Sequence, residues 1–217
     1  MNSQYFEGLL NAILEKDRFR GELIAAKEEF EQVAGQIMES DESYDARVNA
    51  FHNWYLLDRP LTQSGKTPLQ YYIEFNANSL AADTIAHYEE MAGNLHSVFE
   101  MLKFSGGRAW IRDLISRKKH LVEEGGQLEY VERGDLFNTR LFPHEGRDIF
   151  SNYLILHPHP VQKMIRAEAK KVRKAKTDPK PFLFRLLFFH SRWEQFTQMD
   201  VDKIYRFEPA LHGQPAA

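Results

Sequence analysis

Apolar residues recur every three or four positions through the first 94 residues, which is the spacing of an amphipathic helix. This period predicts helices over residues 3–16 and 18–38, a third that ends near Leu57, a fourth that starts at Pro68, and a fifth over residues 79–92. Thr67 before Pro68 is a typical helix start, because threonine caps free backbone N–H groups and proline suits the first turn. Residues 1–94 are therefore predicted to form a helical lobe.

The period shortens to two residues in the next segment, where apolar and polar positions alternate between glycine-containing turns. The pattern predicts five short strands at residues 96–104, 108–115, 118–124, 135–142 and 148–155. Short strands with close turns indicate a small antiparallel barrel or sheet of the SH3-like kind, and closing a barrel would remove exposed strand edges. Residues 95–157 are therefore expected to form a small β domain.

Two more helices are predicted after the strands. A basic helix covers residues 161–176, and a strongly apolar helix follows the breaker around Pro179 and covers residues 182–197. The apolar surface of the last helix is too wide for a helix in solvent, so we expect it to pack on the N-terminal helices. The fold class is thus predicted as α+β, with the C-terminal helices of residues 158–211 completing the helical lobe.

Charge divides the chain into an acidic and a basic part. Residues 1–100 carry 7 Lys and Arg against 17 Asp and Glu, a net charge of −10, whereas residues 101–217 carry 21 against 14, a net charge of +7. The total of −3 does not demand a nucleic-acid partner, but the split permits one locally. It also permits the acidic part of one copy to meet the basic part of another, so the sequence leaves a homo-oligomer open.

The lack of cysteine narrows the chemistry of the chain. With no Cys in 217 residues, disulfides, thiolate zinc sites and Cys nucleophiles are excluded. No apolar stretch of the sequence reaches the roughly 18–20 residues that a membrane helix needs. We therefore expect a cytoplasmic protein without a membrane partner.

Motifs that would indicate an enzyme are incomplete. Residues 64–67, SGKT, resemble the end of a phosphate-binding P-loop, but Pro60 stands where that pattern needs a glycine. The two histidines of His157-Pro158-His159 fit a strand-to-helix corner better than a metal site. No nucleophile–base pair, metal-ligand set or glycine-rich phosphate loop remains, so we predict a protein that is not an enzyme and has no cofactor or metal site.

The basic helix is the strongest functional lead in the sequence. Four of its candidate binding residues recur every three or four positions and form one stripe, and two more widen that stripe. The four are Lys163, Arg166, Lys170 and Arg173, and the two are Lys171 and Lys174. A stripe of this kind can neutralise phosphates. It can equally be a solvated face, a face docked on the acidic helices, or a surface for an acidic protein partner, and the sequence leaves these alternatives open.

One segment of the helical lobe resembles a group of known sequences. Residues 51–61, FHNWYLLDRPL, and residues 65–69, GKTPL, are similar to a segment of uncharacterised bacterial proteins. Those proteins often end in a cysteine-rich zinc tail like that of the preprotein-translocation ATPase. The present sequence has no Cys, so that tail is absent, and the resemblance implies no activity. Physically, the segment indicates helix–loop–helix packing, with Asp58 expected to cap the loop or the next helix.

The leading functional expectation is a non-catalytic cytoplasmic adaptor or regulator that binds another macromolecule, with a protein as the first candidate partner. One alternative is a nucleic-acid-binding protein that uses helix 161–176 and a rim of the β domain. The auxiliary rim contacts would be Arg112, Arg117, Lys118 and Lys119. Another alternative is a small-molecule sensor that holds its ligand between the barrel and the helices.

Overall fold

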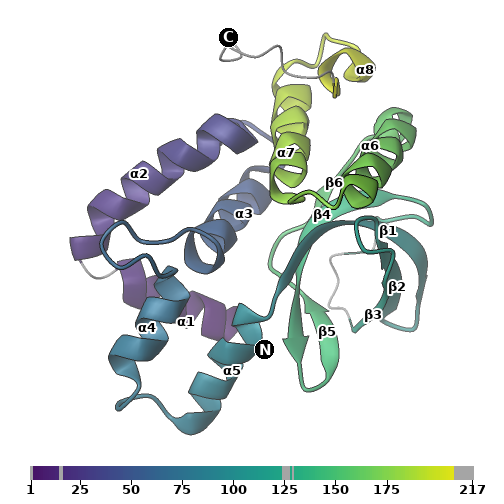
Figure 1. The fold of residues 1–217 in the computed structure, drawn as a ribbon. Coiled ribbons are helices and arrows are strands. Elements are labelled where there is room, and N and C mark those ends of the chain that lie inside the picture. Colours follow the sequence, from purple (N-terminus) through teal and green to yellow (C-terminus); the bar gives the residue numbers. More distant parts are fainter. Residues whose placement is uncertain (1, 15–16, 124–127, 129, 208–217) are drawn as a thin grey trace.

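Five helices form the N-terminal lobe of the computed structural model, which describes residues 2–14, 17–123, 128 and 130–207 (Figure 1). They are α1 (Asn2–Leu14), α2 (Asp17–Ala34), α3 (Tyr44–Leu57), α4 (Pro68–Asn76) and α5 (Ala82–Ala92). The predicted helices are confirmed, although α2 ends four residues before the expected residue 38 and α5 starts three residues later than expected. Parts of the predicted elements at residues 15–16, 124 and 208–211 lie outside the described residues.

The start of α4 shows how the sequence fixes this lobe locally. The Thr67 hydroxyl accepts a hydrogen bond from the backbone N–H of Gln70, and the Gln70 side chain accepts one from the backbone N–H of Thr67 at 3.0 Å. This reciprocal pair satisfies two backbone donors that a helix start leaves free. The apolar faces then meet in one core that contains Phe51 and Leu69, which confirms the helix–loop–helix packing expected of this segment.

Five strands close into a small barrel beside the lobe. They are β1 (Leu95–Ser105), β2 (Arg108–Asp113), β3 (Lys119–Glu123), β4 (Leu136–His144) and β5 (Arg147–Phe150). They follow one another in the order β1, β2, β3, β5 and β4, and β4 pairs again with β1. The strand predicted over residues 148–155 is divided, because β5 ends at Phe150 and a short sixth strand, β6 (Ile155–Leu156), pairs with β4. The barrel interior is filled by alternate residues such as Phe99, Ile111 and Val122.

The prediction of a wholly antiparallel sheet is wrong at one pairing. Strands β3 and β5 pair in parallel, with Val122 opposite Asp148, whereas the other pairings are antiparallel. The reason is geometric, because strand direction cannot alternate all the way around a closed ring with an odd number of members. The predicted α+β fold with a small five-stranded barrel is otherwise confirmed.

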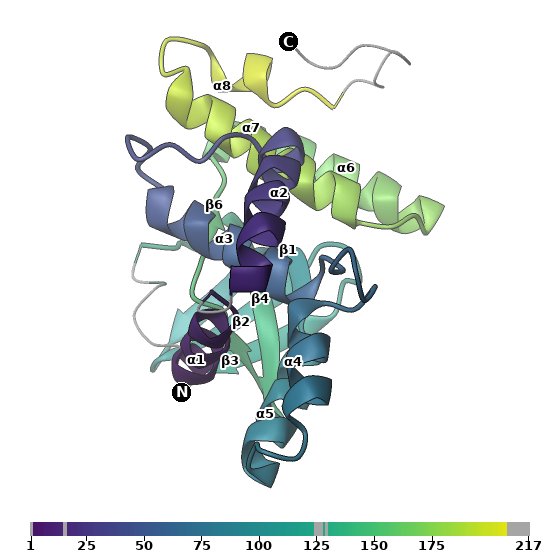
Figure 2. The same ribbon diagram turned by 90° about the vertical axis from the view of Figure 1, so that its left-hand side faces the viewer.

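The C-terminal part contributes η1 (His159–Val161), α6 (Gln162–Ala175), α7 (Lys180–Gln195) and the short α8 (Val201–Ile204), which the sequence pattern did not predict. Helix α7 packs against α2, as Figure 2 shows, so the expected return to the N-terminal helices is confirmed. Helix α6 lies instead over the end of the barrel near β1 and β2 (Figure 1). A second core joins it to α7 and to the barrel through Val98, Leu114, Ile165 and Leu183.

A buried polar contact ties the lobe to the barrel. The guanidinium of Arg140, in the middle of β4, donates to the carboxylate of Asp58 at the end of α3 and to the side-chain oxygen of Asn94 after α5. The Lys180 ammonium, at the start of α7, lies 3.5 Å from the same carboxylate. Asp58 therefore holds two other parts of the chain, instead of capping the loop or α4 as the sequence suggested.

Candidate functional site

The structure divides the six candidate residues of α6 into two groups. The two arginines turn toward the barrel. Arg166 Nη2 donates to the carbonyl oxygen of Gly134 at 2.5 Å, and Arg173 Nη1 donates to that of Leu114 at 2.7 Å. These bonds satisfy loop carbonyls and fix the orientation of α6 on the barrel. Both arginines thus take part in the docking that the sequence left open, although the helix docks on the barrel and not on the acidic helices.

The four lysines of α6 face solvent. Lys163, Lys170 and Lys174 are separated by seven and four residues, which places them on one stripe of the helix. No ion-pair partner lies near these three within the described residues. Lys171 is 71% exposed and pairs with Glu168 one turn before it, at 2.5 Å. The stripe therefore presents cationic charge that its own surroundings do not neutralise.

The outer face of β1, β2 and β3 carries a second group of basic residues around Trp110. Ala109 and Ile111 are buried in the barrel, so their neighbour Trp110 points outward. The Lys103 ammonium lies 5.3 Å from the centre of the Trp110 ring, and the Arg108 guanidinium lies 5.9 Å from it. The geometry of the strands thus places the Trp110 ring beside the cations of Lys103 and Arg108 on the outer face of the barrel.

Glu100 on β1 joins the two basic groups. One of its carboxylate oxygens lies 3.1 Å from Arg112 Nη1 on β2, and the other lies 3.3 Å from Arg166 Nη2 on α6. The same carboxylate thus contacts the strand that bears Trp110 and the helix that bears the lysine stripe. We use the name basic surface for α6 together with the outer face of β1–β3.

The turn between β2 and β3 extends the basic surface with Arg117 and Lys118, and β3 begins with Lys119; all three are exposed. The carboxylate of Asp113 holds this turn, accepting hydrogen bonds from the backbone N–H groups of Ile115 at 2.9 Å and Ser116 at 3.0 Å. The predicted rim residues therefore lie next to Leu114, to which Arg173 of α6 is bonded.

Sequence reasoning missed Lys103, Arg108 and Trp110 as members of this surface. The signal was present, since Arg108, Trp110 and Arg112 alternate along one strand with the buried Ala109 and Ile111. No aromatic residue lies between the basic residues of helix 161–176 itself, so the helix alone does not point to Trp110. Only the barrel brings the strand and the helix together.

Comparison with known proteins places this surface in a wider family. Residues 9–192 match the model of a family of unknown function (DUF7986). The chain belongs to this family. The DUF7986 match spans the helical lobe from residue 9, the barrel and all of α6, so the basic surface lies inside the matched region. The chain matches no curated protein and no solved structure.

The histidines around residue 157 form a structural corner, as expected. His157 Nδ1 lies 3.0 Å from the Tyr205 hydroxyl and His157 Nε2 lies 3.0 Å from the Asn138 side-chain oxygen. Burial lowers the pKa of His157 well below its ordinary value, with the neighbouring His190 acting in the same direction. Within the described part of the chain, no group of three or more His, Asp or Glu could hold a metal ion.

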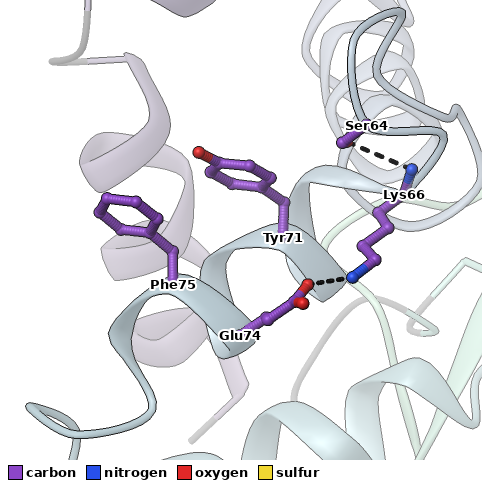
Figure 3. Close-up of a pocket in the computed structure, with 5 residues that line it drawn as sticks. All are labelled: Ser64, Lys66, Tyr71, Glu74 and Phe75. Carbon is purple, nitrogen blue, oxygen red and sulfur yellow. Dashed lines mark hydrogen bonds and ion pairs between the residues drawn. The ribbon is translucent and has the colours of Figure 1, made fainter.

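A cavity of about 460 Å³ opens on α4 and the loop before it. Figure 3 shows the residues that line it, Ser64, Lys66, Tyr71, Glu74 and Phe75. The rings of Tyr71 and Phe75 stack with centroids 5.7 Å apart, and the Lys66 ammonium pairs with the Glu74 carboxylate. The P-loop-like lysine is thus engaged by a carboxylate. The cavity lies on the helical lobe, not between barrel and helices where the sensor hypothesis placed a ligand.

One property of the helices bears on partners. None of the helices among the described residues is both long enough and apolar enough to pass through a membrane.

Proposed function

We propose that this DUF7986 protein is a non-catalytic cytoplasmic binding protein whose basic surface holds a nucleic acid. The observation that carries the proposal is the contact of Glu100 with both Arg112 and Arg166, which makes one surface from two basic elements. Neither element alone is unusual, because exposed lysines are common on helices and strands. Together they offer cations on a helix, on a strand face and on a turn.

The charge of the basic surface fits a polyanion. Its uncompensated members include Lys163, Lys170 and Lys174, which have no ion-pair partner among the described residues. The chain as a whole has a net charge of −3, so the cationic character is local and not a property of the entire molecule. Local positive surfaces of this kind bind phosphates by releasing condensed counterions, which makes the affinity strongly dependent on salt.

An acidic protein partner would be attracted by the same lysines, and the adaptor expectation remains the alternative. Trp110 favours the nucleic acid. An outward-facing aromatic ring among cations suits a ligand that has both phosphates and flat bases. The similarity of residues 51–69 to the zinc-tailed bacterial proteins belongs to the helical lobe and adds no ligand to the proposal.

The test is a salt titration of RNA binding by wild-type protein and two charge-reversal variants. Lys170→Glu with Lys174→Glu changes the basic surface, and Lys27→Glu with Lys66→Glu makes the same change in net charge on the helical lobe. We expect the first variant to lose affinity and to reduce the slope of log K against log salt by about 1.4 for a single strand, since each lost phosphate contact removes about 0.7. The control should keep the wild-type slope.

Two results would overturn the proposal. One is wild-type protein that shows no salt-dependent binding even at low ionic strength. The other is equal loss of affinity in the two double variants, because the effect would then follow net charge and not the position of the lysines. Either result would direct the search to an acidic protein partner.

A further inference from the structure

We propose that Trp110 is a stacking platform for an unpaired base, which makes the basic surface selective for a single nucleic-acid strand over a duplex. This inference rests on the proposed function and adds the class of ligand. In a duplex the faces of the bases are stacked on one another, so an aromatic side chain can take a base face only from an unpaired strand.

The surroundings of Trp110 set it apart from the other two tryptophans of the chain. Trp54 lies against the rings of Phe30 and Phe184, and Trp193 lies against the ring of His190. The ring contacts of Trp110 among the described residues are with the cations of Lys103 and Arg108. Trp54 and Trp193 therefore pack on other rings within the fold, whereas Trp110 lies on the outer face of a strand.

The strand pairing shows what surrounds the Trp110 ring. Arg108 and Arg112 lie about 7 Å to either side along β2, since residues two apart share a face of the strand. Across the sheet, Trp110 is opposite Lys103 on β1 and Leu121 on β3. Leu121 is 43% exposed and gives the ring an apolar neighbour. A base on Trp110 would thus have cations on three sides within reach of its flanking phosphates.

Lys103 and Arg108 are the groups that a base would displace. Both side chains are exposed, and a cation–aromatic contact at an exposed position is weaker than a base stacked on an aromatic ring. Each displaced cation stays close enough to meet a phosphate of the same strand. The exchange therefore replaces two weak contacts with one stack and new phosphate contacts.

The experiment compares Trp110→Leu with Trp110→Phe on two fluorescent RNAs, an unpaired A-rich strand and a duplex of the same length. Leucine keeps an apolar side chain but has no aromatic face, whereas phenylalanine keeps the face. We expect Trp110→Leu to weaken single-strand binding by about 5- to 160-fold, the range that corresponds to removing one base–aromatic stack. Trp110→Phe should lose much less, and neither variant should change duplex binding.

Tryptophan fluorescence gives a second readout that does not depend on a destabilised variant. The single strand should quench the emission of wild-type protein, and Trp110→Phe should bind without that quenching. Equal loss on both RNAs in Trp110→Leu, or no loss on either, would overturn the stacking role.

The same series separates this inference from the proposed function. If Lys170→Glu with Lys174→Glu weakens binding of both RNAs while Trp110→Leu weakens neither, only the stacking role fails. If wild-type protein binds neither RNA, both proposals fail.

Discussion

The carboxylate of Asp58 accepts a hydrogen bond from the guanidinium of Arg140, which follows it by 82 residues in the chain. The Arg140 side chain is 1% exposed, so the charge that it brings to the barrel wall has little contact with water. Burial alone would raise the pKa of Asp58, but the charge and hydrogen bond of Arg140 hold that pKa below its ordinary value. The pair is therefore ionised at neutral pH.

Asp58→Ala is expected to lower the free energy of unfolding by about 3–5 kcal/mol, because it leaves the Arg140 charge buried without its partner. Denaturation in urea measures the change. Asp200→Ala is the matched control, since Asp200 pairs with Lys203 through side chains that are 68% and 59% exposed. That control should leave the midpoint unchanged. Similar midpoints for the two variants would contradict the role of Asp58.

Acidification provides an independent measurement on the same pair. A carboxyl whose folded pKa lies below its ordinary 3.8 stabilises the fold above that pH and loses the contribution as pH falls through the folded pKa. Wild-type protein should therefore lose stability below pH 3.8 through this group, and Asp58→Ala should lack that component. An identical acid dependence in the two proteins would show that the pair does not form.

The arginines of α6 that bond to the barrel should contribute more to the stability of the fold than the exposed lysines of the same helix. Arg166→Ala removes the hydrogen bond to the Gly134 carbonyl and the contact with Glu100, so we expect a loss of about 1–3 kcal/mol in unfolding free energy. Lys170→Ala, on the exposed stripe, should change it by less than about 0.5 kcal/mol. Thermal or urea unfolding of both variants tests this, and a larger loss in Lys170→Ala would reverse the assignment.

His157 should make the protein less stable as pH falls below 6.5. Its folded pKa lies well below its ordinary 6.5, so the unfolded chain takes up a proton that the folded chain does not. The resulting loss is about 1.4 kcal/mol for each pH unit below that value, or about 2 kcal/mol at pH 5. His157→Gln should remove this component from urea unfolding measured between pH 7 and pH 5.

The control for His157 is His159→Gln, two residues away with a side chain that is 74% exposed. It should retain the wild-type dependence of stability on pH. Burial also lowers the pKa of His96 and of His190 to about 3, so a smaller dependence on pH should remain in His157→Gln. A dependence as steep as that of wild-type protein would mean that His157 does not contribute.

Much of the fold could be predicted because residues close together in the sequence specify its helices and strands. The capping box at Thr67 and the two-residue period of β2 are each set by neighbours in the sequence. The parallel pairing of β3 and β5 was missed because direction around a ring depends on closure, which no single strand encodes. Asp58 was misread for the same reason, as its partner Arg140 is brought to it only by the packing of barrel on lobe.

The candidate site was predicted in part for a related reason. The lysines of α6 are exposed as a helical stripe predicts, because a stripe is a local property. Arg166 and Arg173 looked like members of that stripe, but their length and planar donors let them reach barrel carbonyls. Trp110 is recognised as part of the site only in the structure, where Glu100 contacts both β2, which carries Trp110, and α6.

Arg47 should be among the most sensitive positions of the helical lobe. Its buried guanidinium donates to the carbonyl oxygens of Ala34 at 2.9 Å and Gly35 at 2.8 Å, at the end of α2, and to that of Leu187 in α7 at 3.1 Å. It thereby satisfies carbonyls that a helix end leaves without partners.

Arg47→Met keeps most of the side-chain volume but removes every donor. We expect it to lower the unfolding free energy by about 3–4 kcal/mol, since several buried carbonyls lose their partners together. Arg47→Lys keeps a charge but has no planar fork, so its loss should be intermediate. Urea denaturation of the two variants gives the order, and a lysine variant as unstable as the methionine variant would show that the fork geometry, not the charge, supplies the stabilisation.

Gly35, just after α2, is required both by its backbone conformation and by close packing. Its φ of +85° is one that side chains disfavour, and a Cβ there would lie 2.8 Å from the Cβ of Ser191 on α7. Gly146 has a similar φ of +77° in the turn between β4 and β5, with no atom within 4 Å of an added Cβ. The two glycines therefore have similar backbone conformations, and they differ mainly in that only Gly35 is packed closely against another side chain.

Gly146→Ala should cost about 1–2 kcal/mol of unfolding free energy, which is the price of a left-handed conformation for a residue with a Cβ. Gly35→Ala should cost about 1–3 kcal/mol more, because α7 must also move away from α2 to admit the methyl group. Urea denaturation of both variants measures the difference. Equal losses would mean that the contact between α2 and α7 yields without strain, and that Gly35 is needed for its backbone conformation alone.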